Sequence, residues 1–225
     1  MIKEVSANLI MRNNISYYVR PNTLDEWVVD EVSGDAAYIR PLKIKANDIV
    51  LDIGMNIGVF TVTASKKKAI VYGFEPDVEN FKMAEKNCEI NNVNAIIQNV
   101  AISDVVKEQY LYLNEKKNRG QHSFTKVKGR RKTKVFCKGI NDVIAEYKPN
   151  KIKIDCEGEE YNILKAIKSW DGIEAIRLEW HRRILQDSTN TKFEEIIEVM
   201  LNAGFDMIGK KDGKGWTQMV TFIKC

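Results

Sequence analysis

The stretch Ile49-Val-Leu-Asp-Ile-Gly-Met-Asn-Ile-Gly-Val-Phe60 carries the strongest structural signal in this chain. Its apolar first half predicts a buried strand over Ile49–Ile53, and the glycines that follow predict a sharp turn into a helix. Gly54 and Gly58 let the backbone turn and approach a ligand without a Cβ in the way, and Asp52 places a carboxylate at the strand's end. This arrangement is typical of a cradle for a nucleotide-type cofactor.

A second apolar run, Ala69–Phe74, predicts the next strand, and it ends in Glu75-Pro76. Glu75 lies about 20 residues after Gly54, the spacing at which an acid accepts hydrogen bonds from ribose hydroxyls in dinucleotide-binding folds. The other interpretation is that Glu75 caps the helix that follows Pro76. We favour ribose contact because both halves of the pattern occur together.

The identity of the cofactor depends on a glycine that this chain lacks. Dinucleotide cradles use Gly-x-Gly-x-x-Gly, so that the pyrophosphate sits on a helix amino terminus, but Asn56 stands where the second glycine would fall. A ligand with ribose and adenine but no pyrophosphate fits such a turn better than a dinucleotide does. S-adenosylmethionine is a ligand of this kind, and a nicotinamide-dependent dehydrogenase is disfavoured.

Four blocks occur in order: Asp52-Ile-Gly-Met-Asn-Ile-Gly58, Phe74-Glu-Pro76, Ala101-Ile-Ser-Asp104 and Lys153-Ile-Asp-Cys-Glu-Gly-Glu159. Together they resemble the signature blocks of FkbM-family methyltransferases, which are class I S-adenosylmethionine-dependent enzymes. The resemblance covers residues 50–180 and departs at Met55, where the family usually has a small residue such as Ala. It implies a seven-stranded class I fold and methyl transfer, commonly to an oxygen of a sugar or polyketide-type acceptor. The cradle and the resemblance together give these cofactor-binding residues: Asp52, Gly54, Asn56, Gly58, Glu75, Pro76, Ala101 and Asp155.

The remaining pattern alternates strands with helices and predicts an α/β, Rossmann-like fold with a doubly wound, mostly parallel sheet. We expect an amino-terminal extension over residues 1–47, with a helix near 22–33, that packs on the core or covers the site, and one class I methyltransferase domain over 48–225. The predicted strands are 49–53, 69–74, 95–103, 151–155 and 174–180, and a terminal antiparallel hairpin joins 205–209 to 219–224. The predicted helices of this domain are 57–67, 78–91, 159–168 and 192–202.

Two further acids, Asp155 and Glu157, follow the strand at 151–155. Open α/β sheets bind ligands at the carboxyl ends of their strands, so both side chains are expected to face the cleft where cofactor and acceptor meet. Helix capping is the alternative for each of them, although we favour a site role for Asp155. We interpret the next two acids, Glu159 and Glu160, as first-turn residues of a helix.

Glu179 and His181 are two residues apart at the end of another predicted strand, which places them on one face. An imidazole oriented by a carboxylate is a candidate general base for a hydroxyl proton, so the predicted catalytic residues are His181, Asp155 and Glu179. His122, in a polar loop, is a weaker candidate. Cys156 is not expected to be a nucleophile because its flanking carboxylates raise the pKa of the thiol.

Composition agrees with one cytoplasmic domain. The chain has 225 residues and a formal net charge of +4, and no run approaches the roughly 18 apolar residues of a membrane span. Its four cysteines are scattered and show no zinc spacing. No metal site is predicted; a divalent ion held by Asp155 and a second acid is permitted by the sequence but not indicated.

The segment 115–134 is strongly basic, and we interpret it as a solvated loop between strands. The leading hypothesis is an O-methyltransferase whose partner is a small-molecule or glycan acceptor. An RNA methyltransferase that uses the basic segment is the first alternative, although the low net charge does not favour nucleic acid. A non-catalytic cofactor-binding partner protein is the second. The acceptor and the oligomeric state stay open.

Overall fold

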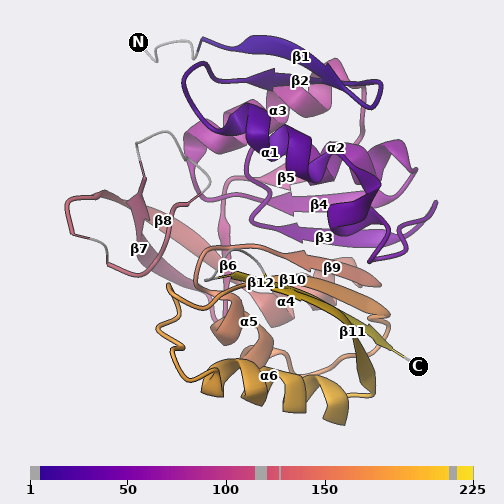
Figure 1. Ribbon diagram of the computed structural model, residues 1–225, viewed down its shortest axis with the longest axis vertical. Helices are drawn as coiled ribbons and strands as arrows, with labels where there is room; N and C mark the ends of the chain where they lie inside the picture. The colour runs from indigo at the N-terminus through magenta and orange to yellow at the C-terminus, as the bar shows by residue number, and fades with distance from the viewer. Residues whose placement is uncertain (1–5, 115–120, 127, 213–216, 225) are drawn as a thin grey trace.

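The computed structural model describes residues 6–114, 121–126, 128–212 and 217–224. A seven-stranded sheet forms its centre (Figure 1). Five adjacent strands are parallel and reach one edge of the sheet, and the last two strands of the chain form an antiparallel hairpin that pairs with the other end of this row. The predicted Rossmann-like, mostly parallel sheet with a carboxyl-terminal hairpin is confirmed. The strand order is β11 (Phe205–Asp212), β12 (Thr217–Lys224), β10 (Ala175–His181), β9 (Lys151–Ile154), β3 (Ile49–Ile53), β4 (Ile70–Phe74) and β5 (Ile96–Gln98).

Helices cover both faces of this sheet (Figure 1). One face carries α1 (Asp25–Val32), the short π-helix η1 (Asp35–Ile39), α2 (Val59–Lys66) and α3 (Val78–Ile90). The other carries α4 (Ile140–Tyr147), α5 (Glu160–Ala166) and α6 (Thr191–Asn202). The predicted helices at 57–67, 78–91, 159–168 and 192–202 are confirmed to within two residues at each end. None of the helices within the described ranges is long and apolar enough to cross a bilayer.

The inner strands are apolar because helices bury both of their faces. Successive side chains of β3 alternate between these faces: Leu51 and Ile53 join the core under α4, α5 and α6, whereas Val50 packs with Phe60 of α2 and Val71 of β4 on the other side. Both cores are closed to water. Ligand access is therefore confined to the strand ends and the loops beyond them.

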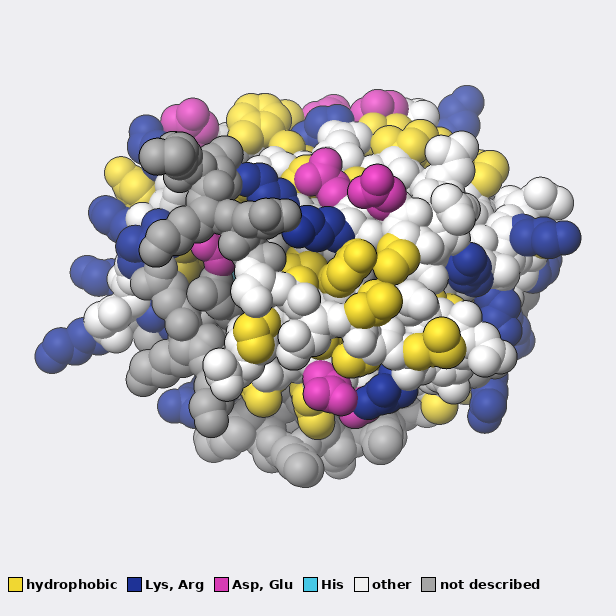
Figure 2. Space-filling model, turned by 90° about the horizontal axis from the view of Figure 1, so that it is seen from above, with side chains coloured by type: hydrophobic (Ala, Val, Ile, Leu, Met, Phe, Trp, Pro, Cys, Tyr) yellow, Lys and Arg dark blue, Asp and Glu magenta, His cyan; other side chains and the backbone are white. Residues whose placement is uncertain are grey.

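The amino-terminal segment packs on the α3 side of the fold. Strands β1 (Asn8–Arg12) and β2 (Ile15–Val19) form a hairpin, anchored by the hydrogen bond between the Tyr17 hydroxyl and Thr63 of α2 at 3.0 Å. Helix α1 begins three residues later than the predicted start near 22, because Asn22 has a left-handed φ of 60°. Figure 2 looks onto this side of the molecule and shows hydrophobic side chains exposed across its middle.

The region between residues 95 and 147 differs most from the prediction. The single strand expected over 95–103 is wrong: β5 joins the main sheet, whereas β6 (Ala101–Ser103) belongs to a separate three-stranded sheet with β7 (Lys107–Leu113) and β8 (Arg131–Gly139). The chain turns between them at Asn99, whose side-chain amide donates to the backbone oxygens of Glu75 and Pro76. Strands β7 and β8 and helix α4 were not predicted.

The basic segment 115–134 is divided by this second sheet. Residues 115–120 and 127 lie outside the described residues, but 131–134 form the start of β8, so the loop interpretation is wrong for them. Their polar sequence gives no apolar alternation, and pairing with β7 makes the strand. Lys132 lies 3.9 Å from the centre of the Tyr110 ring, and Lys134 lies 3.4 Å from Glu108. Part of the basic charge is thus already matched within the sheet.

Candidate active site

A cavity of about 420 Å³ opens at the carboxyl ends of β3, β4, β9 and β10. Parallel strands direct these ends to the same edge of the sheet, so residues distant in sequence meet there. Its volume lies in the range of small-molecule and cofactor sites. The predicted residues that line it are Gly54, Asn56, Glu75, Pro76, Ala101, Asp155, Glu179 and His181, whereas Asp52 and Gly58 do not line it.

The turn after β3 is tight because it passes directly against the end of β9. Gly54 has a φ of +77°, and a Cβ added there would lie 1.8 Å from the backbone oxygen of Asp155. Gly58, with a φ of +80°, begins α2 and packs against α3. The side chain of Met55 fits because residue 73 is glycine. A Cβ at Gly73 would lie only 2.6 Å from the Met55 sulfur. The glycines of the cradle therefore serve close packing of protein against protein.

Glu75 presents its carboxylate to the cavity at the end of β4. Its Oε2 accepts the backbone N–H of Asn56 at 3.0 Å, and its Oε1 accepts that of Asp77 at 2.9 Å. Burial raises the pKa of Glu75 to about 7, while these hydrogen bonds oppose the rise. Oδ1 of Asn56 is also buried and makes no hydrogen bond to the described residues. Both side chains thus offer acceptor oxygens to a ligand with several hydroxyl or amino donors.

The cap of α3 is Asp77 and not Glu75. The Asp77 carboxylate accepts the backbone N–H groups of Glu79 and Asn80, each at 3.0 Å. The helix terminus is satisfied without Glu75, which supports the first of the two interpretations of that residue.

Asp52 lies beneath the cavity and is fully buried. Its Oδ2 accepts the Thr61 hydroxyl at 2.6 Å, and its Oδ1 lies 3.1 Å from Nζ of Lys153. Lys153 also donates to the backbone oxygen of Gly54 at 2.6 Å. Burial lowers the pKa of Lys153, but the charges of Asp52 and Asp155 outweigh burial and raise it. Lys153 therefore links Asp52 to the turn at Gly54, and the sequence analysis did not select Lys153 as a site residue.

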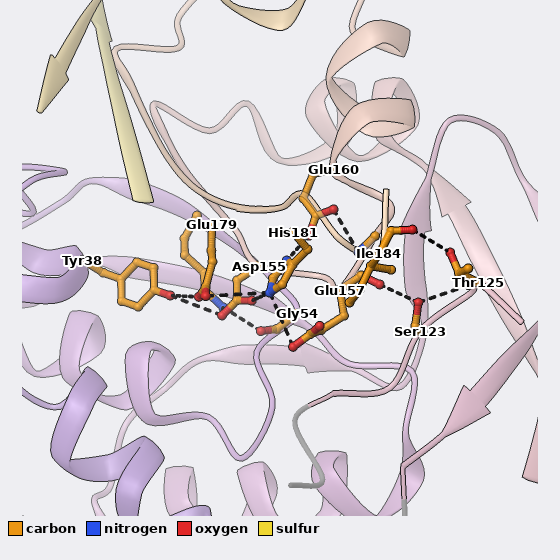
Figure 3. Close-up of polar contacts among 12 residues, drawn as sticks. Tyr38, Gly54, Ser123, Thr125, Asp155, Glu157, Glu160, Glu179, His181 and Ile184 are labelled. Carbon is orange, nitrogen blue, oxygen red and sulfur yellow. Dashed lines mark hydrogen bonds and ion pairs between the residues drawn. The ribbon is translucent and has the colours of Figure 1, made fainter. Parts of the chain in front are cut away.

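His181 lies at the centre of a group of acids beyond β9 and β10 (Figure 3). Its Nδ1 is 2.5 Å from Oε1 of Glu160. Its Nε2 is 3.5 Å from Oε1 of Glu157, 3.8 Å from Oε1 of Glu179 and 3.9 Å from Oδ1 of Asp155. We call these five residues the acid–imidazole cluster. The structure thus brings together the three predicted catalytic residues, and Glu179 and His181 share one face as expected.

Tyr38 of η1 completes the cluster from the amino-terminal segment. Its hydroxyl lies 3.2 Å from Oδ2 of Asp155 and 3.3 Å from Oε2 of Glu179, and its proton is shared between them (Figure 3). Burial, and then the nearby carboxylates, raise the pKa of Tyr38 well above its ordinary value, so the group stays a donor. No local motif marks Tyr38, which lies 117 and 141 residues from these partners.

The two acids assigned to a helix first turn have different surroundings. Glu160 does lie in the first turn of α5, but its fully buried carboxylate orients His181, so the assignment to a first turn alone is wrong for it. Glu159 faces away from the cavity, where it accepts the Ser103 hydroxyl and lies 3.7 Å from Nζ of Lys107.

Negative charge is crowded in the cluster. Burial lowers the pKa of His181, but Glu157 and Glu160 outweigh it and hold the pKa well above the ordinary value. Burial raises the pKa of Glu157 to about 8 and that of Glu179 to about 7. The carboxylates thus favour a positively charged imidazole when no other cation lies among them, and the pKa values of Glu157 and Glu179 lie near neutral pH.

The other two candidates are less central. His122 lines the cavity, and its Nδ1 accepts the backbone N–H of Asn114 at 2.9 Å. Cys156 also lines it, but burial raises the pKa of its thiol well above the ordinary value. This agrees with the expectation that Cys156 is not a nucleophile.

The pattern of the Methyltransferase FkbM domain matches residues 52–207. A tRNA (guanine(37)-N(1))-methyltransferase of Xenopus tropicalis is 34% identical over 55 residues, which cover 24% of this chain and 11% of that protein. A fibrillarin pre-rRNA processing protein of Methanococcus jannaschii is structurally similar, with a TM-score of 0.54 and 15% identity over 99% of this chain and 85% of that one. A Pyrococcus abyssi tRNA (uracil-54, C5)-methyltransferase in complex with S-adenosyl-L-homocysteine has a TM-score of 0.51 and 14% identity, over 96% of this chain and 44% of that one.

The structural similarities lie at identities where the fold alone is shared, and the curated relative matches over a small part of its length. The family match extends over more than half of the chain and contains the cradle, Glu75, Asp155 and His181. The chain belongs to the FkbM family of class I S-adenosylmethionine-dependent methyltransferases.

Proposed function

We propose that the chain transfers a methyl group from S-adenosylmethionine to a hydroxyl oxygen of a sugar, a glycan or another small-molecule acceptor. The acid–imidazole cluster is the observation that carries this proposal. In the sheet, β3 lies between β4, which is followed directly by Glu75, and β9, which ends beside the cluster. Ribose at Glu75 and an acceptor at the cluster would therefore flank the turn at Gly54, where the methyl group has to be transferred.

The residues present fit this cofactor. Glu75 accepts the ribose hydroxyls, and the unpartnered Oδ1 of Asn56 accepts a further donor. Pro76 and Ala101 line the same part of the cavity. Asp52, Gly54, Gly58 and Asp155 have a second role in this assignment, because their contacts fix the shape of the turn itself.

When bound, S-adenosylmethionine supplies an activated methyl group, so the protein has to align the acceptor oxygen and remove one proton. Asp155 and Glu179, held by Tyr38, position the acceptor hydroxyl. Glu157, whose pKa is raised to about 8 by burial, would accept the proton that the acceptor hydroxyl loses on methylation. The sequence suggested His181 as the base; its raised pKa favours Glu157 in that role and leaves His181 to balance the carboxylate charge.

RNA methylation is the second candidate, because two of the similar proteins are tRNA methyltransferases. Exposed basic residues on β8, among them Arg131 and Lys132, would contact phosphates. The acceptor end of the cavity counts against it, since a carboxylate-rich wall repels a phosphate backbone. This candidate requires salt-dependent RNA binding that falls when Arg130, Arg131 and Lys132 are neutralised.

A transfer assay with methyl-labelled S-adenosylmethionine separates these candidates. One arm offers a panel of sugars and glycans, and the other offers tRNA transcripts. Label in the sugar arm, lost by a factor of at least about 100 in Glu157→Gln with unchanged cofactor affinity, supports the proposal. Label in RNA alone would refute it. Cofactor binding without any transfer in either arm would indicate the non-catalytic binding protein.

A further inference from the structure

Three side chains of the cluster present donor atoms to one point. His181, Asp155 and Glu179 each offer one donor atom, and these three atoms lie within 4.8 Å of one another (Figure 3). Nε2 of His181 lies 3.9 Å from Oδ1 of Asp155 and 3.8 Å from Oε1 of Glu179. The separations from Nε2, 3.8 and 3.9 Å, are too long for direct hydrogen bonds. They are close to the spacing of about 3.0–3.4 Å between two donors that bind the same ion at about 2.1 Å.

The opposite atom of each group is held by another side chain. Glu160 binds Nδ1 of His181, which leaves Nε2 directed into the cavity. The Tyr38 hydroxyl binds Oδ2 of Asp155 and Oε2 of Glu179, which leaves the other oxygen of each carboxylate facing His181. Protein metal sites use such partners to fix the orientation of their ligands.

The cluster also contains one buried oxygen without a hydrogen-bond partner among the described residues, and a histidine nitrogen whose carboxylate neighbours are no closer than 3.5 Å. His181 is 5% exposed, yet its Nε2 makes no hydrogen bond to the described residues. Oε2 of Glu157 is buried and likewise unpaired within those residues. The nearest lysine, Lys153, is 3.6 Å from Asp155 but closer to Asp52, at 3.1 Å. Carboxylates thus outnumber cations here, and Nε2 of His181 lies among three of them.

We propose that Asp155, Glu179 and His181 bind one divalent first-row transition-metal ion of the Mn²⁺ type. Two carboxylates suit an ion of this type, and the imidazole adds a nitrogen donor that Mg²⁺ and Ca²⁺, which prefer oxygen ligands, do not favour. On binding, the ion would replace the proton on Nε2 of His181. Glu157, whose Oε1 is 3.5 Å from Nε2 of His181, lies beside these three ligands. In the reaction, whose assignment rests on the proposed function, three protein ligands leave open positions for the acceptor hydroxyl, and Glu157 remains available for its proton.

The experiment measures Mn²⁺ binding directly on the whole chain. The protein is stripped with a chelator and titrated with Mn²⁺ under electron paramagnetic resonance, with pulsed detection of coupling to imidazole nitrogen. We expect one ion per chain and a nitrogen coupling that disappears in His181→Gln. Glu160→Gln removes the carboxylate that orients the His181 ring, and it is expected to weaken Mn²⁺ binding by about 10–100-fold.

Glu159→Gln is the matched control, because its carboxylate is in the same segment but faces Ser103 and Lys107; Mn²⁺ affinity should not change. Circular dichroism and titration with S-adenosylmethionine establish that each variant is folded. If the cofactor binds and millimolar Mn²⁺ does not, the metal site is refuted and the proposed function stands. Equal Mn²⁺ binding by wild type and His181→Gln also refutes it. Mn²⁺ bound at His181 with no acceptor methylated supports the site and refutes the proposed function.

Discussion

The substitution Glu75→Gln tests whether burial of the ionised Glu75 carboxylate lowers the free energy of unfolding. The folded pKa of Glu75 is about 7, against 4.5 for the group in an ordinary setting. Because the folded pKa is raised, the folded protein binds this proton more tightly than the unfolded chain does. The contribution to stability is fully present below pH 4.5 and is lost as the pH rises through 7. Gln cannot ionise, so the variant lacks this part of the pH dependence.

The size of the effect follows from the shift. A difference of about 2.5 pKa units corresponds to about 3 kcal/mol at 1.36 kcal/mol per unit, and about 2 kcal/mol of it falls between pH 5.5 and 8. Gln retains one acceptor oxygen for the two backbone N–H groups of Asn56 and Asp77. The unmatched N–H costs about 1–3 kcal/mol at every pH. The change with pH therefore measures ionisation, whereas the constant offset measures hydrogen bonding.

Urea unfolding at intervals from pH 5.5 to 8 provides the free energies, with the slope against urea compared between proteins. We expect the wild type to lose about 2 kcal/mol relative to Glu75→Gln across this range. Glu198→Gln, on the exposed face of α6, controls for the removal of a charge outside the site. Parallel pH profiles for wild type and Glu75→Gln would refute the reasoning, since burial would then impose no penalty on the carboxylate.

Gly54→Ala should destabilise the fold by more than about 1 kcal/mol, measured by urea unfolding, because its Cβ would meet the Asp155 backbone oxygen at a positive φ. Lys153→Met leaves Asp52 buried without its cation and should cost about 3–5 kcal/mol in the same assay. Adding Asp52→Asn to that variant should restore part of the loss, and a further decrease would contradict the pairing. Cys156→Ala should leave kcat unchanged in the transfer assay, because the raised pKa of this half-buried thiol keeps it from acting as a nucleophile.

The meeting of Gly54, Asn56 and Glu75 at one cavity could be predicted because its signals are local. Gly54 and Asn56 share one turn with the strand that precedes them, and Glu75 directly follows its neighbour β4. Parallel pairing of two adjacent strands then brings the groups together without further information. The same reasoning placed Glu179 and His181 on one face, since strand alternation depends only on their spacing.

Other parts of the site depend on contacts between distant elements. Lys153 lies in a strand where lysines alternate with isoleucines, and the central position of this strand between β3 and β10 buries it against Asp52. Glu160 looked like a helix first-turn acid, and the approach of β10 to α5 makes it the partner of His181. Strand order and helix packing decide both outcomes, and neither is encoded in the local pattern.

Tyr38 shows that the family pattern does not contain the whole site. The match begins at residue 52, yet Tyr38 binds both Asp155 and Glu179. Trp27 and Glu31 of α1, also outside the match, line the same cavity. The matched blocks supply the turn, the ribose-side acid and the cluster, which any acceptor would require. Residues before 52 add the ring of Trp27, the carboxylate of Glu31 and the hydroxyl of Tyr38 on the side of the cavity where we place the acceptor. Acceptor choice is therefore expected to depend on α1 and η1 more than on the four signature blocks.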